Sequence, residues 1–124
     1  MTKLIAITIP ILPGKTEQWR KFTNELKTTR QKDFNESRKK LNVYERTFFQ
    51  STPNGDMVIV TLEGENPQAA FQKFGQATDE FSKWFIKQVK EIHNLDLTQP
   101  MPKDSIPELI AESTPISITE PVTH

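Results

Sequence analysis

The sequence contains no cysteine among its 124 residues. This absence excludes disulfide bonds, metal sites built from thiolates and a cysteine nucleophile. A chain without cysteine is compatible with a reducing compartment, and we expect a cytoplasmic protein.

Long hydrophobic runs are also missing. The most apolar stretch, residues 4–12, is interrupted by Thr8 and Pro10, and it is far shorter than the about 20 residues that a membrane-spanning helix needs. Pro13 and Gly14 follow it, where a signal peptide would have a small-residue cleavage site. We interpret this stretch as a strand and expect no membrane partner.

Glycine and histidine are scarce. The 4 glycines are not clustered, so the chain has no glycine-rich loop of the kind that holds phosphate groups. The 2 histidines are His93 and His124, and the second belongs to a proline-rich tail. We therefore expect no metal site and no cofactor, and we find no serine, histidine and acid order typical of a hydrolase.

The chain has no net charge, since 16 basic residues balance 16 acidic ones. This balance does not favour nucleic acid as a partner. Residues 1–50 nevertheless carry 11 basic and 5 acidic residues, and residues 51–124 carry 5 and 11. Two interpretations are open: solvated faces, or charge-matched docking between subunits or between the tail and the first helix.

One group of basic residues falls in the first helical region: Lys27, Arg30, Lys32, Arg38, Lys39 and Lys40. Asp33 and Glu36 interrupt this group, and no aromatic platform accompanies it. Because single-stranded nucleic acids are held by basic grooves with stacking aromatics, we expect no nucleic-acid binding.

The length and composition are those of one small domain. A chain of 124 residues has room for one core. Its hydrophobic fraction of 35% is low and its mean hydropathy is −0.58. A monomer can therefore bury only a modest apolar surface, and a subunit interface would add stability.

The first half of the chain predicts a strand, a helix and a hairpin. Residues 3–11 alternate, with isoleucines on one face, which is typical of a strand. A long helix is predicted over residues 16–41, with an apolar stripe at Trp19, Phe22, Leu26, Phe34 and Leu41. Residues 43–50 and 57–63 flank the turn residues Asn54 and Gly55, which predicts a β-hairpin.

The second half predicts two helices and a tail. One helix follows Asn66 and Pro67, and the last one begins near Asp79 and buries the stripe Phe81, Trp84, Phe85, Val89 and Ile92. Residues 95–97 are a possible short last strand.

The last 27 residues, 98–124, hold 5 of the chain's 9 prolines. Residues 105–112 could form one or two helical turns, and Ile116 alternates with Ile118. A docked arm and partial disorder are both open. We therefore divide the chain into a domain of residues 1–97 and a proline-rich tail of residues 98–124.

This element order is the βαββα(β) plan of a ferredoxin-like α+β sandwich with an antiparallel sheet. Helices would cover one face of that sheet. The other face also carries apolar residues, since Met57 and Ile59 point away from Val58 and Val60. We therefore expect a homodimer in which two sheets pack face to face.

The chain resembles the dimeric α/β-barrel superfamily over residues 1–97. The resemblance rests on a strand followed by Pro13-Gly14-Lys15 and a helix, on the hairpin at residues 49–56, and on the late aromatic helix with Phe81, Trp84 and Phe85. It implies a dimeric barrel similar to small uncharacterised bacterial members. The superfamily also contains quinol monooxygenases that need no cofactor, haem-degrading monooxygenases and stress-response proteins.

Haem-degrading members use an asparagine from the first strand together with a tryptophan and a histidine from the late helical region. This chain has Trp84 and His93 but no asparagine in residues 3–11. Nine helical residues turn through about 900°, so the two side chains lie on opposite sides of a regular helix. His93 has two interpretations: a haem ligand or base, or a residue placed for the helix dipole.

The strand at residues 43–50 supplies the other candidate site residues. Tyr44 and Arg46 share one face, and Glu45 lies on the other. These groups could hold a polar ligand or take up a proton in a dimer cavity, or they could form ion pairs between strands or subunits. Trp19 and Trp84 are most simply core residues.

These observations predict a dimeric barrel that binds a small molecule or a partner at its inter-subunit sheet face without catalysis. The speculative ligand-binding residues are Tyr44, Glu45, Arg46, Trp84 and His93. The alternative is a monooxygenase-like enzyme acting on an aromatic or haem-like substrate.

Overall fold

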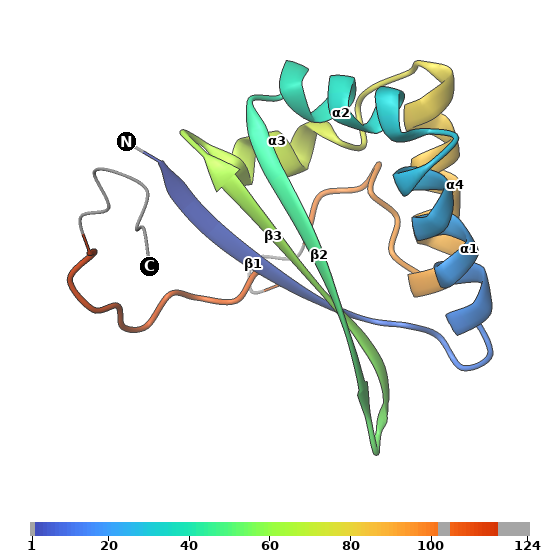
Figure 1. Ribbon diagram of the computed structural model, residues 1–124, viewed down its shortest axis with the longest axis horizontal. Helices are drawn as coiled ribbons and strands as arrows, with labels where there is room; N and C mark the ends of the chain where they lie inside the picture. Colours follow the sequence, from blue (N-terminus) through green and yellow to red (C-terminus); the bar gives the residue numbers. More distant parts are fainter. Residues whose placement is uncertain (1, 102–104, 117–124) are drawn as a thin grey trace, which may run out of the picture.

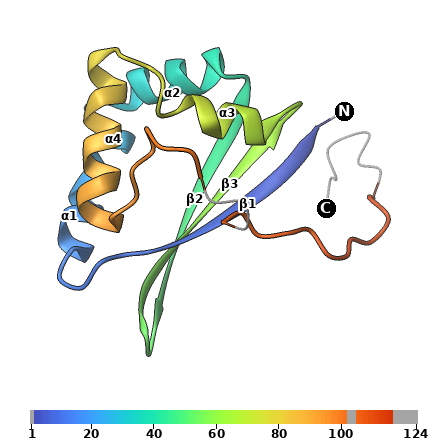
Figure 2. The ribbon, with the colours of Figure 1, turned by 180° about the vertical axis from the view of Figure 1, so that it is seen from behind.

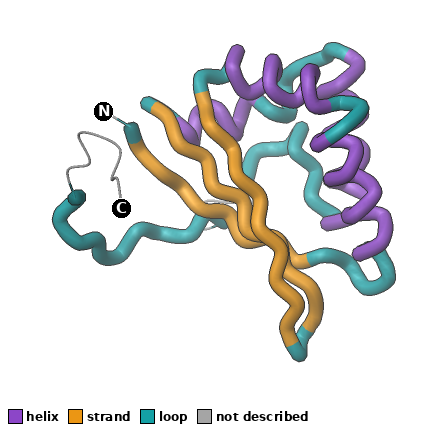
Figure 3. Tube along the Cα trace, in the orientation of Figure 1, coloured by secondary structure: helices purple, strands orange, loops and turns teal. Residues whose placement is uncertain are grey.

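The computed structural model describes residues 2–101 and 105–116. Within these residues the chain forms three strands and four helices, in the order β1 (Lys3–Pro10), α1 (Thr16–Lys27), α2 (Gln31–Lys40), β2 (Val43–Thr52), β3 (Gly55–Gly64), α3 (Pro67–Lys73) and α4 (Glu80–His93). The strands form one layer, and the helices lie together on one side of it (Figures 1 and 3). This α+β arrangement is consistent with the ferredoxin-like fold expected from the sequence.

The sheet is antiparallel, with β3 between β1 and β2. The predicted hairpin of β2 and β3 is confirmed. Thr52 pairs with Gly55, so the loop consists of Pro53 and Asn54. Gly55 has a φ of 127°, a backbone conformation that side chains disfavour, which explains why glycine follows the asparagine.

The prediction of one long helix over residues 16–41 is wrong, because the helix is interrupted between α1 and α2. Thr28 donates its hydroxyl to the carbonyl of Asn24 at 2.7 Å. The N–H of Arg30 donates to the carbonyl of Glu25 at 2.8 Å. Such threonine bonds to the backbone compete with continuation of a helix, and the interruption lets α2 pack beside β2 (Figure 1).

The predicted starts of α3 and α4 are confirmed by their capping bonds. Asn66 accepts the N–H of Ala69 on Oδ1 at 3.1 Å. Asp79 accepts the N–H of Ser82 at 3.1 Å and its hydroxyl at 2.7 Å. These bonds satisfy donors that a helix start leaves without partners. At its other end α4 stops at Asn94, whose φ of 56° is left-handed and reverses the chain.

The predicted short strand at residues 95–97 is not formed. These residues make an irregular loop in which Leu97 is buried. The carbonyl of Leu97 lies so close to Gly75 that a Cβ at residue 75 would overlap it. The loop therefore packs against the end of α3, and in the part of the chain that the structure describes β1 pairs with β3 alone.

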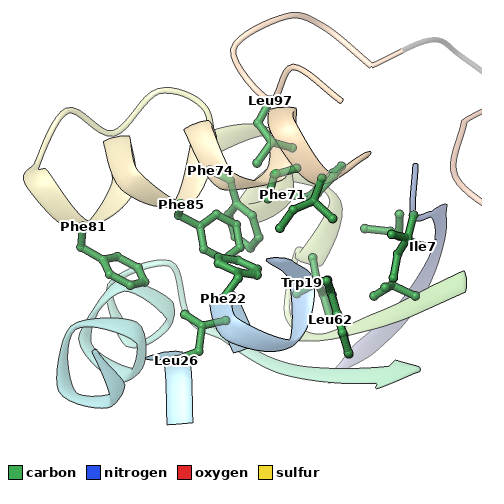
Figure 4. Close-up of a cluster of buried hydrophobic side chains, with 14 residues drawn as sticks. Ile7, Trp19, Phe22, Leu26, Leu62, Phe71, Phe74, Phe81, Phe85 and Leu97 are labelled. Atoms are coloured by element: carbon green, nitrogen blue, oxygen red, sulfur yellow. The ribbon is translucent and has the colours of Figure 1, made fainter. Parts of the chain in front are cut away.

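The core lies between the helices and the sheet and confirms the predicted apolar stripes of α1 and α4. Figure 4 shows Phe22, Phe74 and Phe85 gathered between the helices, with Leu62 of β3 below them. The buried cluster consists of Ile7, Ile11, Trp19, Phe22, Leu26, Val58, Leu62, Phe71, Phe74, Phe81, Phe85, Val89, Ile92 and Leu97. None of the described helices is both long enough and apolar enough to cross a membrane.

The other side of the sheet, which we call the open face, carries apolar residues that remain in water. It is formed by Leu4, Ala6, Thr8, Tyr44, Arg46, Phe48, Gln50, Met57, Ile59, Thr61 and Glu63. Leu4, Tyr44 and Phe48 expose 55%, 59% and 52% of their surface. No helix of residues 2–101 covers this face (Figures 1 and 2).

Residues 105–116, which we call the C-terminal arm, form neither a helix nor a strand. The helical turns considered for residues 105–112 are therefore absent, and Ile118 lies outside the described residues. Met101 and Ile106 pack against the core, whereas residues 107–116 are all exposed. The arm runs away from the body beside β1 (Figures 1 and 2).

Candidate functional site

The alternation of β2 separates the candidate residues of that strand onto two sides of the sheet. Glu45 faces the helices, in register with Leu62 of β3. Tyr44 and Arg46 lie on the open face, where Arg46 Nη2 bonds to Glu63 Oε1 at 3.2 Å. The guanidinium of Arg46 also lies 4.8 Å from the centre of the Tyr44 ring. The inter-strand ion pair, one of the two interpretations of this strand, is therefore present.

A cavity of about 50 Å³ lies between the helices and the sheet. Most of its lining is aromatic or aliphatic and comes from the strands, α1, α3 and α4. Its polar lining residues are Thr23, Glu45, Thr47 and His93. Two of the five candidate residues, Glu45 and His93, thus line the same apolar cavity.

Glu45 is held by a buried ion pair with Arg38 of α2. Arg38 Nε lies 2.6 Å from Glu45 Oε1, and the two side chains expose only 8% and 4% of their surface. A second oxygen of Glu45, Oε2, accepts the Thr47 hydroxyl at 3.5 Å. The carboxylate therefore keeps one weakly bonded oxygen at the cavity wall.

Aromatic rings enclose the guanidinium of Arg38. Its Cζ lies 3.9 Å from the ring centre of Phe74, 4.6 Å from that of Phe85 and 5.1 Å from that of Phe34. Arg38 Nη1 donates to the hydroxyl of Ser37 at 2.9 Å. Arg38 Nη2 has no hydrogen-bond partner among the described residues, so the ring faces supply much of the solvation that this buried cation has lost.

Arg38 is the candidate site residue that the sequence analysis missed, because it was grouped with the other basic residues of this region. The sequence nevertheless contains a pattern that indicates burial of Arg38. Arg38 lies four residues after Phe34 and three before Leu41, so it stands on the apolar stripe where a side chain faces the core. A charge on such a stripe indicates a buried pair.

His93 at the end of α4 links that helix to the end of β1. Its Nδ1 lies 2.8 Å from the carbonyl oxygen of Pro10. Because a carbonyl only accepts, Nδ1 carries the proton and Nε2 is left with a lone pair in the neutral ring. Burial lowers the pKa of His93 more than the bond to Pro10 raises it, so the ring favours the neutral form over the charged one that the helix-dipole interpretation needs.

Trp84 does not line the cavity. Its ring lies 5.2 Å from that of Phe22 and 5.8 Å from that of Phe81, with the guanidinium of Arg30 4.1 Å from its centre. Trp84 and His93 are therefore not brought together, in agreement with their opposite positions on α4. The tryptophan of the cavity wall is Trp19.

A wider groove of about 590 Å³ lies outside this cavity, beside α2 and the start of β2. Arg38 and Glu45 contribute to its wall, together with Tyr44 and Glu63. Glu45 thus lies between the groove and the cavity.

Within the described part of the chain, no group of three or more histidine, aspartate or glutamate side chains could hold a metal ion. A haem group is far larger than the cavity of about 50 Å³, and only His93 of the expected tryptophan and histidine pair reaches it. The residues present do not fit a haem site.

No protein-family model, curated protein or solved structure matches the chain. The chemistry of the site therefore has to be inferred from its own residues.

Proposed function

We propose that the chain is a dimeric α/β-barrel protein that binds a small, mainly apolar molecule between its sheet and its helices. The observation that carries the proposal is the apolar cavity with a buried, ion-paired carboxylate in its wall. Ligand sites of this kind are mostly apolar and contain a few fixed polar groups. This proposal puts the ligand site on the helix side of the sheet, and not at the inter-subunit sheet face expected from the sequence, so the open face is left for pairing with a second copy.

The lining defines the ligand's chemistry. Aromatic walls from Trp19, Phe22 and Phe74 favour an aromatic or branched aliphatic body. Glu45, as an ionised carboxylate, accepts hydrogen bonds but donates none. A ligand with one hydroxyl or N–H group therefore fits better than a carboxylic acid, which would meet the negative charge of Glu45.

The size of the cavity sets a condition on binding. An apolar cavity of about 150 Å³ holds benzene, whereas this one measures about 50 Å³. A ring-sized ligand must therefore displace part of the wall. Leu95 and Leu97 belong to the irregular loop after α4 and line the cavity, so this loop is the part that would move.

Titration with p-cresol and with toluene tests the proposal, because the two molecules differ only by a hydroxyl group. Trp19 in the cavity wall is the reporter, and Trp84→Phe removes the other tryptophan signal. From the quenching of Trp19 fluorescence, we expect a dissociation constant for p-cresol at least about tenfold lower than that for toluene. The reason is that a hydrogen bond to a charged acceptor is worth about 1.5–3 kcal/mol. Equal affinities, or no quenching at millimolar concentrations, would reject the proposed site.

A pair of matched variants separates cavity binding from binding elsewhere. Val60 lines the cavity, while Ile59, its neighbour on β3, points to the open face. Val60→Leu adds volume inside the cavity and should weaken p-cresol binding several-fold. Ile59→Leu should leave binding unchanged, and the reverse pattern would place the ligand on the open face.

The second candidate function is a monooxygenase-like reaction on an aromatic substrate. It is favoured by His93, whose neutral ring keeps a basic Nε2 at the cavity and could take a proton from a quinol hydroxyl. Hydroquinone and O₂ would give hydroxybenzoquinone and water, so the quinol itself supplies the electrons. Oxygen uptake with hydroquinones that is lost in His93→Gln would support an enzyme. If no hydroquinone gives oxygen uptake, ligand binding without catalysis is the function that remains.

The open face supports the pairing part of the proposal. Tyr44, Phe48 and Leu4 expose more than half of their surface there. Ile59 and Met57 of β3 lie on the same face, and exposed apolar surface of this kind is typical of interaction surfaces. A second copy placed sheet to sheet would cover them, as in a dimeric barrel.

A further inference from the structure

The C-terminal arm is fixed at its root and exposed along the rest of its length. Ile106 packs against the core. Beyond it, Leu109, Ile110 and Ile116 expose 68%, 81% and 80% of their surface. Large apolar side chains gathered on an extended segment are typical of a docking element.

Within one copy of the chain, the C-terminal arm covers neither the open face nor the edge of β1. Leu4, Tyr44 and Phe48 of the open face remain more than half exposed. β1 pairs only with β3 in the residues described, although the arm leaves the body beside that strand (Figures 1 and 2). The chain thus presents an apolar arm and an apolar sheet face that do not meet within one copy.

The area of the open face is small for a stable dimer. Strands of 8 to 10 residues, at about 3.4 Å per residue and about 4.8 Å apart, give a flat projection of about 450 Å². Stable interfaces bury about 800 Å² on each partner. Sheet-to-sheet contact alone therefore falls short.

The arm can supply the missing area. An extended segment as long as residues 105–116 reaches about 40 Å, which is longer than β1 at about 27 Å. By the scaling for unfolded chains it exposes about 1,900 Å², and one side of it laid on a surface buries roughly a third. Each arm then adds about 600 Å² of buried area, which is more than the flat projection of the sheet face.

We propose that the two copies of the dimer exchange their C-terminal arms, so that the arm of each packs on the part of the other's open face that the opposing sheet leaves uncovered. This inference rests on the proposed pairing of open faces. The opposing sheet and the exchanged arm then together cover Leu4, Tyr44 and Phe48, which lie on the two edge strands of the open face, and the root at Ile106 holds each arm in place.

Analytical ultracentrifugation of the full chain tests the exchange. The triple variant Leu109→Ser, Ile110→Ser and Ile116→Ser removes only exposed side chains, so the fold of each copy should be retained. We expect its dimer dissociation constant to rise by about 30-fold or more, as for anchors of an interface. The control variant Glu108→Gln, Glu112→Gln, in the same arm, should stay within about threefold of the parent chain.

A spin label identifies the copy on which the arm lies, and the absence of cysteine allows a single label at Ile110→Cys. Labelled ¹⁴N chain is mixed with unlabelled ¹⁵N chain, so that broadened amide signals report contacts between copies. We expect broadening at Tyr44 and Phe48 of the ¹⁵N copy.

The possible results separate this inference from the pairing on which it rests. A parent chain that stays monomeric overturns both. A parent dimer that is unchanged in the triple variant and gives no broadening between copies overturns the exchange alone. Broadening that appears only when the spin label and ¹⁵N are on the same chain shows that the arm folds back on its own body and also overturns it.

Discussion

The buried pair of Arg38 and Glu45 gives the most demanding test of the site's electrostatics. The two side chains expose 8% and 4% of their surface and meet at 2.6 Å. Removing one partner of such a pair leaves a buried charge without compensation, which costs about 3–5 kcal/mol. Arg38→Met and Glu45→Leu should therefore each lower the free energy of unfolding by about that amount.

The double variant Arg38→Met, Glu45→Leu should be far less damaged than the sum of the single ones. Replacing a buried pair by apolar residues of similar volume is often neutral or stabilising, so we expect a coupling energy of about 3 kcal/mol or more. Urea unfolding of the four chains of this cycle measures it.

Arg46 provides a matched control on the neighbouring position of the same strand. Its bond to Glu63 spans 3.2 Å, but the two side chains expose 43% and 37% of their surface. Exposed pairs contribute about 0–1 kcal/mol, so Arg46→Met should cost at most about 1 kcal/mol. Single variants of Arg38 and Glu45 that cost no more than Arg46→Met would refute the reasoning.

Four further variants test other parts of the structure. Burial lowers the pKa of His93, so the unfolded chain binds a proton more readily than the folded one. The free energy of unfolding should therefore fall as the pH drops below about 6.5. Urea unfolding between pH 5 and 8 should show a smaller fall in His93→Gln. Gly75→Ala would push a Cβ into the backbone of Leu97, so it should lower the free energy of unfolding in urea by about 3 kcal/mol or more. Gly14 has open space around it but a φ of 81°, so Gly14→Ala should lower the free energy of unfolding by only about 1 kcal/mol. Asp79→Ala removes the cap of α4 and should lower the melting temperature at pH 7 by an amount equivalent to about 1 kcal/mol. Hydrogen bonds from Ser82 lower the pKa of Asp79. The difference in melting temperature between the parent chain and Asp79→Ala should therefore shrink as the pH falls through the carboxyl range near about 4.

Much of the fold could be predicted from local patterns. The alternation of Ile5, Ile7 and Ile9 placed β1 and its buried face correctly, and Asn66 and Asp79 marked the helix starts. Each of these features depends on residues next to one another in the chain, where periodicity and capping act.

The break between α1 and α2 and the missing fourth strand could not be predicted in this way. The apolar stripe passes from Leu26 to Phe34 at a helical spacing, so it hides the interruption that Thr28 introduces. Residues 95–97 carry leucines that suit a strand, but Leu97 packs against Gly75 instead. The break thus follows from a local bond that the periodicity hides, whereas tertiary packing, which no local pattern reports, decided the conformation of residues 95–97.

The candidate site was recognised only in part. The pattern of β2 correctly assigned Glu45 and Arg46 to opposite faces. It could not tell which face would contain a cavity, since both were apolar enough to be covered. Arg38 was missed because it was grouped with its basic neighbours despite its place on the apolar stripe, and the ring faces that enclose it are brought together by three helices.

The most direct test of ligand binding between sheet and helices is an NMR titration of the ¹⁵N-labelled chain with p-cresol. We expect the largest amide shifts at Thr47, Val60 and Val89, which surround the cavity. Shifts centred on Tyr44 and Phe48 of the open face, or no shifts at saturating p-cresol, would contradict the proposed site.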